Sequence, residues 1–259
     1  MDLRELSVTT SGAVRHPWEQ ARANAIEYLL RKDETDNAAI LDFGCGDAFV
    51  ANRLAERFEN SQVFAVDKAF TPAARLRIEP GLDKRVRLYD SLATVEAKGV
   101  RASWVLLLDV LEHCEQDLAV LKSVVASHSA KPGAVFLITV PAFQGLFSKH
   151  DEFLGHFRRY SLKDLARVAE DAGLTVTYRS YFFSSLLLPR GLTVVLERLG
   201  LLKSSPKGLG DYRPRPFFDS LIRAMLDADF RVCEWLARAG IYLPGLSCLV
   251  VARKPVRAV

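Results

Sequence analysis

Several aspartates and two glycines stand where they could hold a small-molecule cofactor. In the run Ile40-Leu41-Asp42-Phe43-Gly44-Cys45-Gly46-Asp47, an apolar stretch ends in a glycine-rich turn just before a helical pattern begins. The glycines let the backbone approach a ligand closely. Asp67 ends the next apolar stretch about 20 residues further on, where doubly wound folds place a carboxylate that accepts hydrogen bonds from both hydroxyls of a ribose. The spacing therefore predicts a nucleoside-cofactor turn.

The charge around this turn distinguishes between cofactors. A dinucleotide pyrophosphate needs open amides at a helix N-terminus, and its fingerprint continues to a third glycine, which is missing here. The ends of the predicted strands instead supply acidic side chains, namely Asp42, Asp67, Asp90 and Asp109. Such a rim repels two phosphates and suits a ligand that carries a sulfonium and an ammonium. We therefore expect S-adenosylmethionine (SAM), and an NAD-dependent oxidoreductase is the disfavoured alternative.

The elements that must position these residues alternate between helix and strand. The apolar patterns predict helices over residues 18–31, 48–58, 117–127, 161–172, 186–202 and 217–239. They predict strands over residues 39–43, 62–66, 85–89, 104–108, 134–140, 174–181 and 247–252. This alternation implies an α/β fold with a doubly wound, Rossmann-like, seven-stranded sheet that is mostly parallel, with a helical insertion before the last strand.

The length of 259 residues fits one domain, 1–259. We divide it into an N-terminal helical segment (1–38), a core (39–181), a helical insertion that caps the substrate (182–245) and the last strand (246–254). Two local signals bound elements within the core. Lys131-Pro132-Gly133 predicts a turn before the fifth strand, and Ser161 with Asp164 predicts a helix start that approximates a capping box, with Gly173 at its end.

Three motifs of the chain resemble successive motifs of class I SAM-dependent methyltransferases. They are Leu41-Asp42-Phe43-Gly44-Cys45-Gly46, then Ala65-Val66-Asp67, then Asp109-Val110-Leu111-Glu112-His113. The resemblance covers about residues 18–176. It is closest to the type 11 and type 23 methyltransferase families and to ubiquinone-biosynthesis O-methyltransferases, in which a similar Val-Leu-Glu-His run follows the fourth strand. The insertion matches less well.

This resemblance implies roles for residues along the cofactor. Asp42, Gly44 and Gly46 would surround the methionyl part of SAM, and Asp67, with Lys68 beside it, would hold the ribose. Asp90, Ser91 and Leu92 would border the adenine, and Asp109 and Val110 would flank the sulfonium. Arg22, on the helix before the first strand, would meet the SAM carboxylate.

The segment from Ser148 to Tyr160 follows the fifth strand, where a doubly wound sheet presents loops over its ligand. Methyl transfer requires alignment of donor and acceptor, exclusion of water and, for a hydroxyl acceptor, removal of a proton. The candidate catalytic residues are His156, the preferred base, with His150 and Tyr160. The candidate substrate-binding residues are His113, Arg158 and Arg159. Alternatively, His156 and Arg159 brace this segment through a pair with Asp151.

Composition narrows the classes of partner. The net charge of +4 comes from basic residues spread along the chain, so a nucleic-acid partner is not expected. No secretory pattern begins the sequence, which predicts a cytoplasmic protein. Four cysteines occur singly and are interpreted as reduced thiols. No carboxylate set beyond those assigned to SAM indicates a metal, so we expect metal-independent catalysis.

The insertion supplies apolar residues that could cover a greasy acceptor. Its most apolar stretch is broken by Pro189, Arg190, Glu197 and Arg198, which argues against a membrane span. Peripheral membrane contact through residues 182–207 is an alternative to ordinary burial.

The sequence therefore predicts a SAM-dependent methyltransferase that acts on a small-molecule or lipid-linked acceptor, with oxygen as the expected acceptor atom. A non-catalytic SAM-binding protein that regulates or stabilises a partner is the alternative. Nitrogen and carbon acceptors and the oligomeric state stay open.

Overall fold

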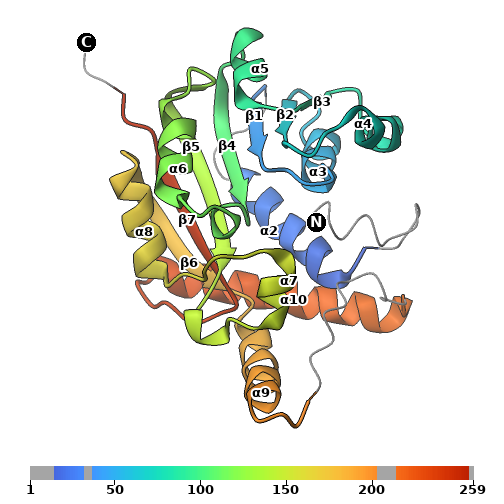
Figure 1. Cartoon of the computed structure of the whole chain (residues 1–259), viewed down its shortest axis with the longest axis vertical. Helices are drawn as coiled ribbons and strands as arrows, with labels where there is room; N and C mark the ends of the chain where they lie inside the picture. The colour runs from blue at the N-terminus through green and yellow to red at the C-terminus, as the bar shows by residue number, and fades with distance from the viewer. Residues whose placement is uncertain (1–14, 32–36, 203–213, 257–259) are drawn as a thin grey trace.

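A single sheet organises the part of the chain that the computed structural model describes, residues 15–31, 37–202 and 214–256 (Figure 1). Within these residues it has seven strands in the order β3-β2-β1-β4-β5-β7-β6. Strands β1 to β5 pair in parallel, and β7 runs antiparallel to both of its neighbours. The strands are β1 (Ala39–Phe43), β2 (Gln62–Val66), β3 (Val86–Tyr89), β4 (Ala102–Leu108), β5 (Ala130–Pro141), β6 (Thr175–Phe182) and β7 (Ser247–Arg253). The predicted fold class is confirmed.

The strand order reverses between β1 and β4. From β1 the chain moves outward to β2 and β3, and it then crosses back to β4 on the other side of β1. Such a switch point opens a crevice outside the carboxyl ends of the two strands. The turn after β1 and the turn after β4 therefore lie side by side at the predicted cofactor position.

Helices cover both faces of the sheet because neighbouring residues of each strand point to opposite sides. Ile40 and Leu106 pack in one core cluster, while Leu41 and Leu107 pack in the other. The helices are α2 (Pro17–Arg31), α3 (Phe49–Arg57), α4 (Pro72–Ile78), α5 (Leu92–Ala97), α6 (Asp117–Ala126), α7 (Lys149–Leu154), α8 (Leu162–Asp171), α9 (Leu187–Arg198) and α10 (Pro216–Arg238). Short 3-10 turns are η1 (Glu79–Gly81), η2 (Leu111–His113), η3 (Gln144–Leu146) and η4 (Ser184–Leu186).

The two local sequence signals, the helix start at Ser161 and the turn at residues 131–133, had different outcomes. The Ser161 Oγ accepts a hydrogen bond from the Asp164 amide at 3.1 Å, so α8 begins where the sequence predicted. The turn predicted at Lys131-Pro132-Gly133 does not interrupt the strand, and this prediction is corrected. β5 runs through all three residues, and its register against β4 shifts instead, because Ala102 faces Ala130 but Trp104 faces Val135. Pro132 and Gly133, which has a left-handed φ, lie in the resulting bulge.

The insertion between β6 and β7 divides into two parts (Figure 1). Helix α10 lies along α2, where Asn24 donates to the Asp227 carboxylate at 3.0 Å, and Leu226 and Phe230 join the core. Helix α9 projects from the end of the sheet near α7. The connection between them, residues 199–215, lies mostly outside the described residues. No helix in the described ranges is long and apolar enough to cross a bilayer.

Candidate active site

The glycine turn after β1 is clamped between two neighbouring strands. The Gly44 amide donates to the Val66 carbonyl at 2.7 Å, and Gly44 has a φ of +73°. A Cβ built at Gly44 would lie 2.6 Å from Cγ2 of Val110, so the turn after β4 leaves no room for a side chain. Gly44 and Val110, which the sequence assigned separately to the cofactor site, therefore pack closely against each other.

Asp42, beneath this turn, carries a carboxylate without a partner. The residue is 1% exposed, and neither carboxylate oxygen accepts a hydrogen bond. Burial raises the pKa of Asp42 to about 7, and the charges of Asp67 and Asp47 push in the same direction. An unpartnered buried carboxylate is rare and favours a cationic ligand. The site therefore fits the ammonium group of SAM.

Asp67 stands at the end of β2, as predicted, and its carboxylate is held by the backbone. One oxygen accepts from the Gly46 amide and the other from the Ala69 amide, each at 2.9 Å. Lys68 beside it is exposed. At the end of β3, the Asp90 carboxylate accepts from the Thr94 hydroxyl at 2.9 Å and from the Ser91 hydroxyl at 3.2 Å.

These hydrogen bonds lower the pKa of Asp90. The Ser91 hydroxyl also caps α5, which begins at Leu92. The acidic ends of β1, β2 and β3 are therefore aligned along one edge of the sheet.

Arg22 and Asp109 meet at the carboxyl end of β4. Asp109 adopts a left-handed φ of +54° and forms an ion pair with Arg22. The Arg22 guanidinium also donates to the Thr139 hydroxyl at 2.6 Å, which in turn donates to Asp109 at 3.1 Å. Burial lowers the pKa of Arg22 to about 10, so it stays charged at neutral pH. The sequence predicted both residues for the crevice but not their ion pair.

The segment 144–160 (the lid) is organised around one fully buried carboxylate, Asp151. It accepts from Nδ1 of His156 at 2.9 Å, from Nε of Arg159 at 2.8 Å and from the Ser148 amide at 3.0 Å. Burial alone would raise the pKa of Asp151, but the hydrogen bonds from His156 and Arg159 outweigh it and hold the pKa well below its usual range. The bracing interaction considered for His156 and Arg159 is therefore present.

The other predicted lid residues also have protein partners. The Tyr160 hydroxyl donates to Asp117 at 2.6 Å, and burial with this bond raises the pKa of Tyr160 well above its usual range. Arg158 pairs with Asp117 and donates to the Glu115 carbonyl at 2.6 Å. His150 is half-buried, and burial together with the charge of Arg190 lowers its pKa. Tyr160 and Arg158 thus tie the lid to the start of α6.

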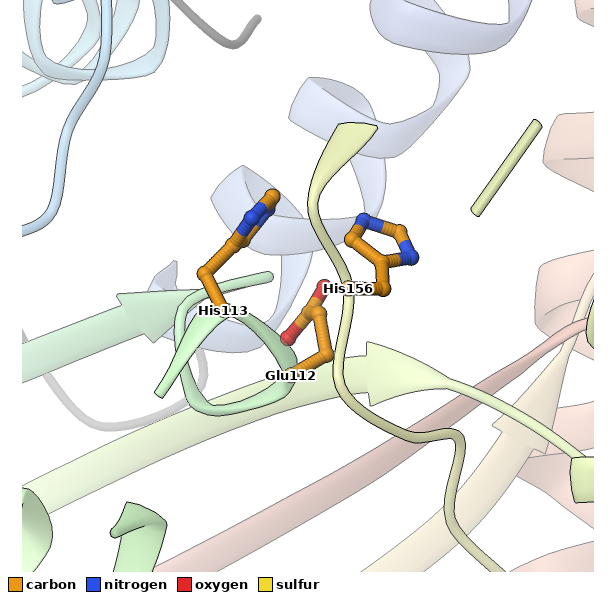
Figure 2. A group of neighbouring side chains, drawn as sticks. All are labelled: Glu112, His113 and His156. Carbon is orange, nitrogen blue, oxygen red and sulfur yellow. The ribbon is translucent and has the colours of Figure 1, made fainter. Parts of the chain in front are cut away.

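Sequence reasoning did not assign Glu112 to the site, although it quoted the motif that contains it. Glu112 is fully buried, neither carboxylate oxygen has a hydrogen-bond partner, and burial raises its pKa to about 8. Figure 2 shows its carboxylate between the imidazoles of His113 and His156. The two rings meet edge to face, with centroids 4.5 Å apart. The signal that could have identified Glu112 is the pair Glu112-His113, an acidic residue followed directly by a histidine after the fourth strand.

The doubly wound sheet, the glycine turn and the acidic strand ends define a class I SAM-dependent methyltransferase. The model of a methyltransferase domain family matches residues 15–179, and the chain belongs to this family. This confirms the recognition made from the motifs. No curated protein matches the chain.

Three solved structures share this fold at low sequence identity. A protein from Galdieria sulphuraria assigned as a sarcosine dimethylglycine methyltransferase is 16% identical with a TM-score of 0.55, and the match covers 92% of this chain and 86% of that protein. Coclaurine N-methyltransferase, bound to N-methylheliamine and S-adenosylhomocysteine, is 16% identical with a TM-score of 0.54 and coverages of 90% and 72%. Phosphoethanolamine N-methyltransferase 2 from Haemonchus contortus is 14% identical with a TM-score of 0.54 and coverages of 98% and 57%.

Proposed function

We propose that this chain transfers the methyl group of SAM to an oxygen atom of a small-molecule or lipid-linked acceptor. The observation that carries the choice of oxygen is the imidazole of His156, which Asp151 holds by Nδ1 beside the buried Glu112. An amine acceptor is nucleophilic once it is neutral, whereas a hydroxyl must lose its proton during the transfer. A fixed imidazole on the acceptor side serves the second requirement.

The residues predicted to bind SAM support this proposal by their charges and by the room that they leave for a ligand. SAM, when bound, supplies a methyl group activated by a sulfonium. Asp42 would accept the ammonium of the ligand, and Asp67 would accept its ribose hydroxyls. Asp90, Ser91 and Leu92 would border the adenine. Gly44, Gly46 and Val110 shape the turn against which the ligand lies, and Arg22, balanced by Asp109, offers a cation for its carboxylate.

His156 would act on the acceptor hydroxyl. With Nδ1–H donated to Asp151, the other ring nitrogen keeps its lone pair and can accept a proton. The negative charge of Asp151 stabilises the imidazolium that results. Arg159 and Ser148 fix Asp151 from the other side, so the imidazole keeps its orientation.

A lipid-linked acceptor is favoured by the exposed face of α9. Four apolar residues at helical spacing lie open to solvent, with exposures of 83% for Leu188, 62% for Leu192, 52% for Val195 and 66% for Leu199. Isolated exposed leucines are common, but a continuous stripe indicates an interaction surface. The apolar stripe of α9 would hold the tail of the acceptor or rest on the membrane that contains it.

Two arginines join this helix to the lid. Arg190 donates to the Ser148 hydroxyl at 2.6 Å, and Arg198 donates to the Gly145 carbonyl at 2.8 Å. Helix α9 is therefore adjacent to the segment that carries His156, with its apolar stripe on the side of the helix away from Arg190.

The cofactor assignment is tested by calorimetric titration with SAM and S-adenosylhomocysteine. We expect micromolar binding by the natural chain and at least a tenfold loss in Asp67→Ala, with Asp171→Ala as an exposed control that binds normally. Circular dichroism checks that each variant is folded. Absence of binding by folded, ligand-free protein would contradict the methyltransferase function.

The acceptor class is tested by transfer of a labelled methyl group to matched hydroxyl and amine acceptors, each with and without an alkyl tail. Labelling of the tailed alcohol above the others supports the proposal, and labelling of amines alone overturns the choice of oxygen.

Vesicle flotation with a Leu188→Ser, Leu192→Ser double variant tests the apolar stripe of α9. Leu76→Ser is its matched control, because Leu76 is 77% exposed on α4, away from α9 (Figure 1).

A further inference from the structure

The side chain of Glu112 is the least explained polar group in the site. It is fully buried, and both of its oxygens lack a hydrogen-bond partner. Leaving such a group unpaired is unfavourable, and more so for an ion than for a neutral polar group. Glu112 has no role in the base mechanism above. The nearby charges of Arg22 and Arg159 act on it without donating a hydrogen bond, so both of its oxygens are open to a ligand.

Two imidazoles complete a ligand set around this carboxylate. One ligand atom each from Glu112, His113 and His156 lie within 4.8 Å of one another. Figure 2 shows the three side chains converging from two segments, with Glu112 and His113 on the turn after β4 and His156 on the lid. Two imidazole nitrogens and one carboxylate oxygen are donors that suit divalent transition metals, and three protein ligands leave positions open for a further ligand.

The surroundings of His156 match those of a metal-binding histidine. Its Nδ1 is hydrogen-bonded to Asp151 at 2.9 Å, which fixes the tautomer that leaves the other nitrogen available. Histidines that bind metals almost always make such a bond to a carboxylate or carbonyl group. Arg159 and Ser148 hold Asp151 in turn, so the imidazole is oriented without any ion.

We propose that Glu112, His113 and His156 bind one divalent transition metal ion of the zinc or manganese type, with open positions that take the acceptor hydroxyl. This replaces our expectation of metal-independent catalysis, and it deepens the proposed function because it concerns the acceptor side of the same site. The ion lowers the pKa of the hydroxyl, whose proton leaves to solvent. The oxygen then forms its bond to the methyl carbon as the carbon–sulfur bond breaks, which releases S-adenosylhomocysteine. His156 then serves as a ligand and not as the base.

The test is metal binding by the purified full chain, so it needs no acceptor. After chelator treatment, Co²⁺ is titrated and its visible absorption followed, and Zn²⁺ is titrated by calorimetry. We expect one equivalent to bind with a Kd of micromolar or tighter. Glu112→Gln and His156→Gln should weaken binding at least 100-fold, and Asp151→Asn should weaken it about 10- to 100-fold, as for other residues that orient a metal ligand.

His128→Gln is the matched control, since His128 is exposed after α6 and outside the cluster. Binding of S-adenosylhomocysteine shows that each variant is folded and separates this proposal from the proposed function. Failure of chelated, cofactor-binding protein to take up Co²⁺ or Zn²⁺ overturns the metal site and leaves His156 as the base. Equal metal affinity in Glu112→Gln and the natural chain overturns it as well.

Discussion

The lid and the cofactor turn each bury an aspartate, but the two carboxylates have opposite surroundings. Asp151 in the lid accepts hydrogen bonds from His156, Arg159 and Ser148, and its pKa lies well below the usual range. Asp42 under the turn accepts none, and its pKa rises to about 7. The first carboxylate holds the protein together without a ligand. The second lowers the stability of the ligand-free protein, because burial disfavours its charged form and no hydrogen bond compensates.

The largest effect that this comparison predicts is at Asp151. Asp151→Ala leaves the side chain of Arg159 buried without its carboxylate, and breaking a buried pair in this way costs about 3–5 kcal/mol of unfolding free energy. Urea unfolding measures it. Asp83→Ala removes a more exposed ion pair with Arg85 and should cost less than about 1 kcal/mol. Equal losses of unfolding free energy in the two variants would mean that the buried ion pair of Asp151 stabilises the protein no more than an exposed one.

At Asp42 we expect a substitution to raise the unfolding free energy, whereas at Asp151 it lowers it. The pKa of Asp42 rises from 3.8 to about 7 on folding. Protonation of Asp42 therefore contributes its full stabilisation below pH 3.8, and this contribution is lost as the pH rises through 7. Asp42→Asn should therefore raise the unfolding free energy of the ligand-free chain by on the order of 2–4 kcal/mol at pH 8 and hardly at all at pH 4. SAM affinity should fall at least tenfold. Urea unfolding at both pH values and calorimetry check this, and a gain of equal size at both would contradict it.

A smaller effect is expected at the turn itself. Gly44→Ala places a methyl group 2.6 Å from Val110 at a φ of +73°, so it should cost about 1–3 kcal/mol and weaken SAM binding. Adding Val110→Ala relieves the contact but not the backbone strain, and it should recover only part of the loss. Gly81→Ala is the control, because a Cβ there meets nothing within 4 Å. Full recovery in the double variant would show that space alone matters.

The smallest effect concerns the junction of α9 with the lid. Arg198 is exposed and donates to the Gly145 carbonyl, so Arg198→Ala should change the unfolding free energy by less than about 1 kcal/mol. Amide exchange over residues 144–150 should nevertheless accelerate, because the lid loses one of its attachments to α9. Unchanged exchange in this segment would mean that the bond from Arg198 does not help to hold the lid.

The parts of the fold that depend on local pattern could be predicted from the sequence. Strands β1 and β2 have the predicted bounds, and Asp67 and Asp109 stand at strand ends as expected. The exception, Lys131-Pro132-Gly133, has all the residues of a turn. Pairing with β4 and β7 outweighs that local preference and converts it into a bulge.

The candidate site was predicted less completely, because a sequence shows which carboxylates exist but not which lone pairs are occupied. Asp151 was recognised as a partner for His156 and Arg159, but only the folded lid brings all three together. Glu112 was overlooked because an acidic residue in a helical turn is usually solvated. Its burial arises from residues distant in the sequence, including the lid segment whose Phe157 amide donates to the Glu112 carbonyl.

The antiparallel placement of β7 has an evolutionary consequence. Phe182, the last residue of β6, faces Ser247, the first residue of β7, so residues 183–246 leave and rejoin the sheet at one point on its carboxyl edge. The entropy of closing such a connection grows only slowly with its length. Segments can therefore be lengthened, exchanged or trimmed here without altering the strand register. The topology thus separates a segment that can vary in length from strands β1 to β4, which carry the glycine turn and the acidic strand ends.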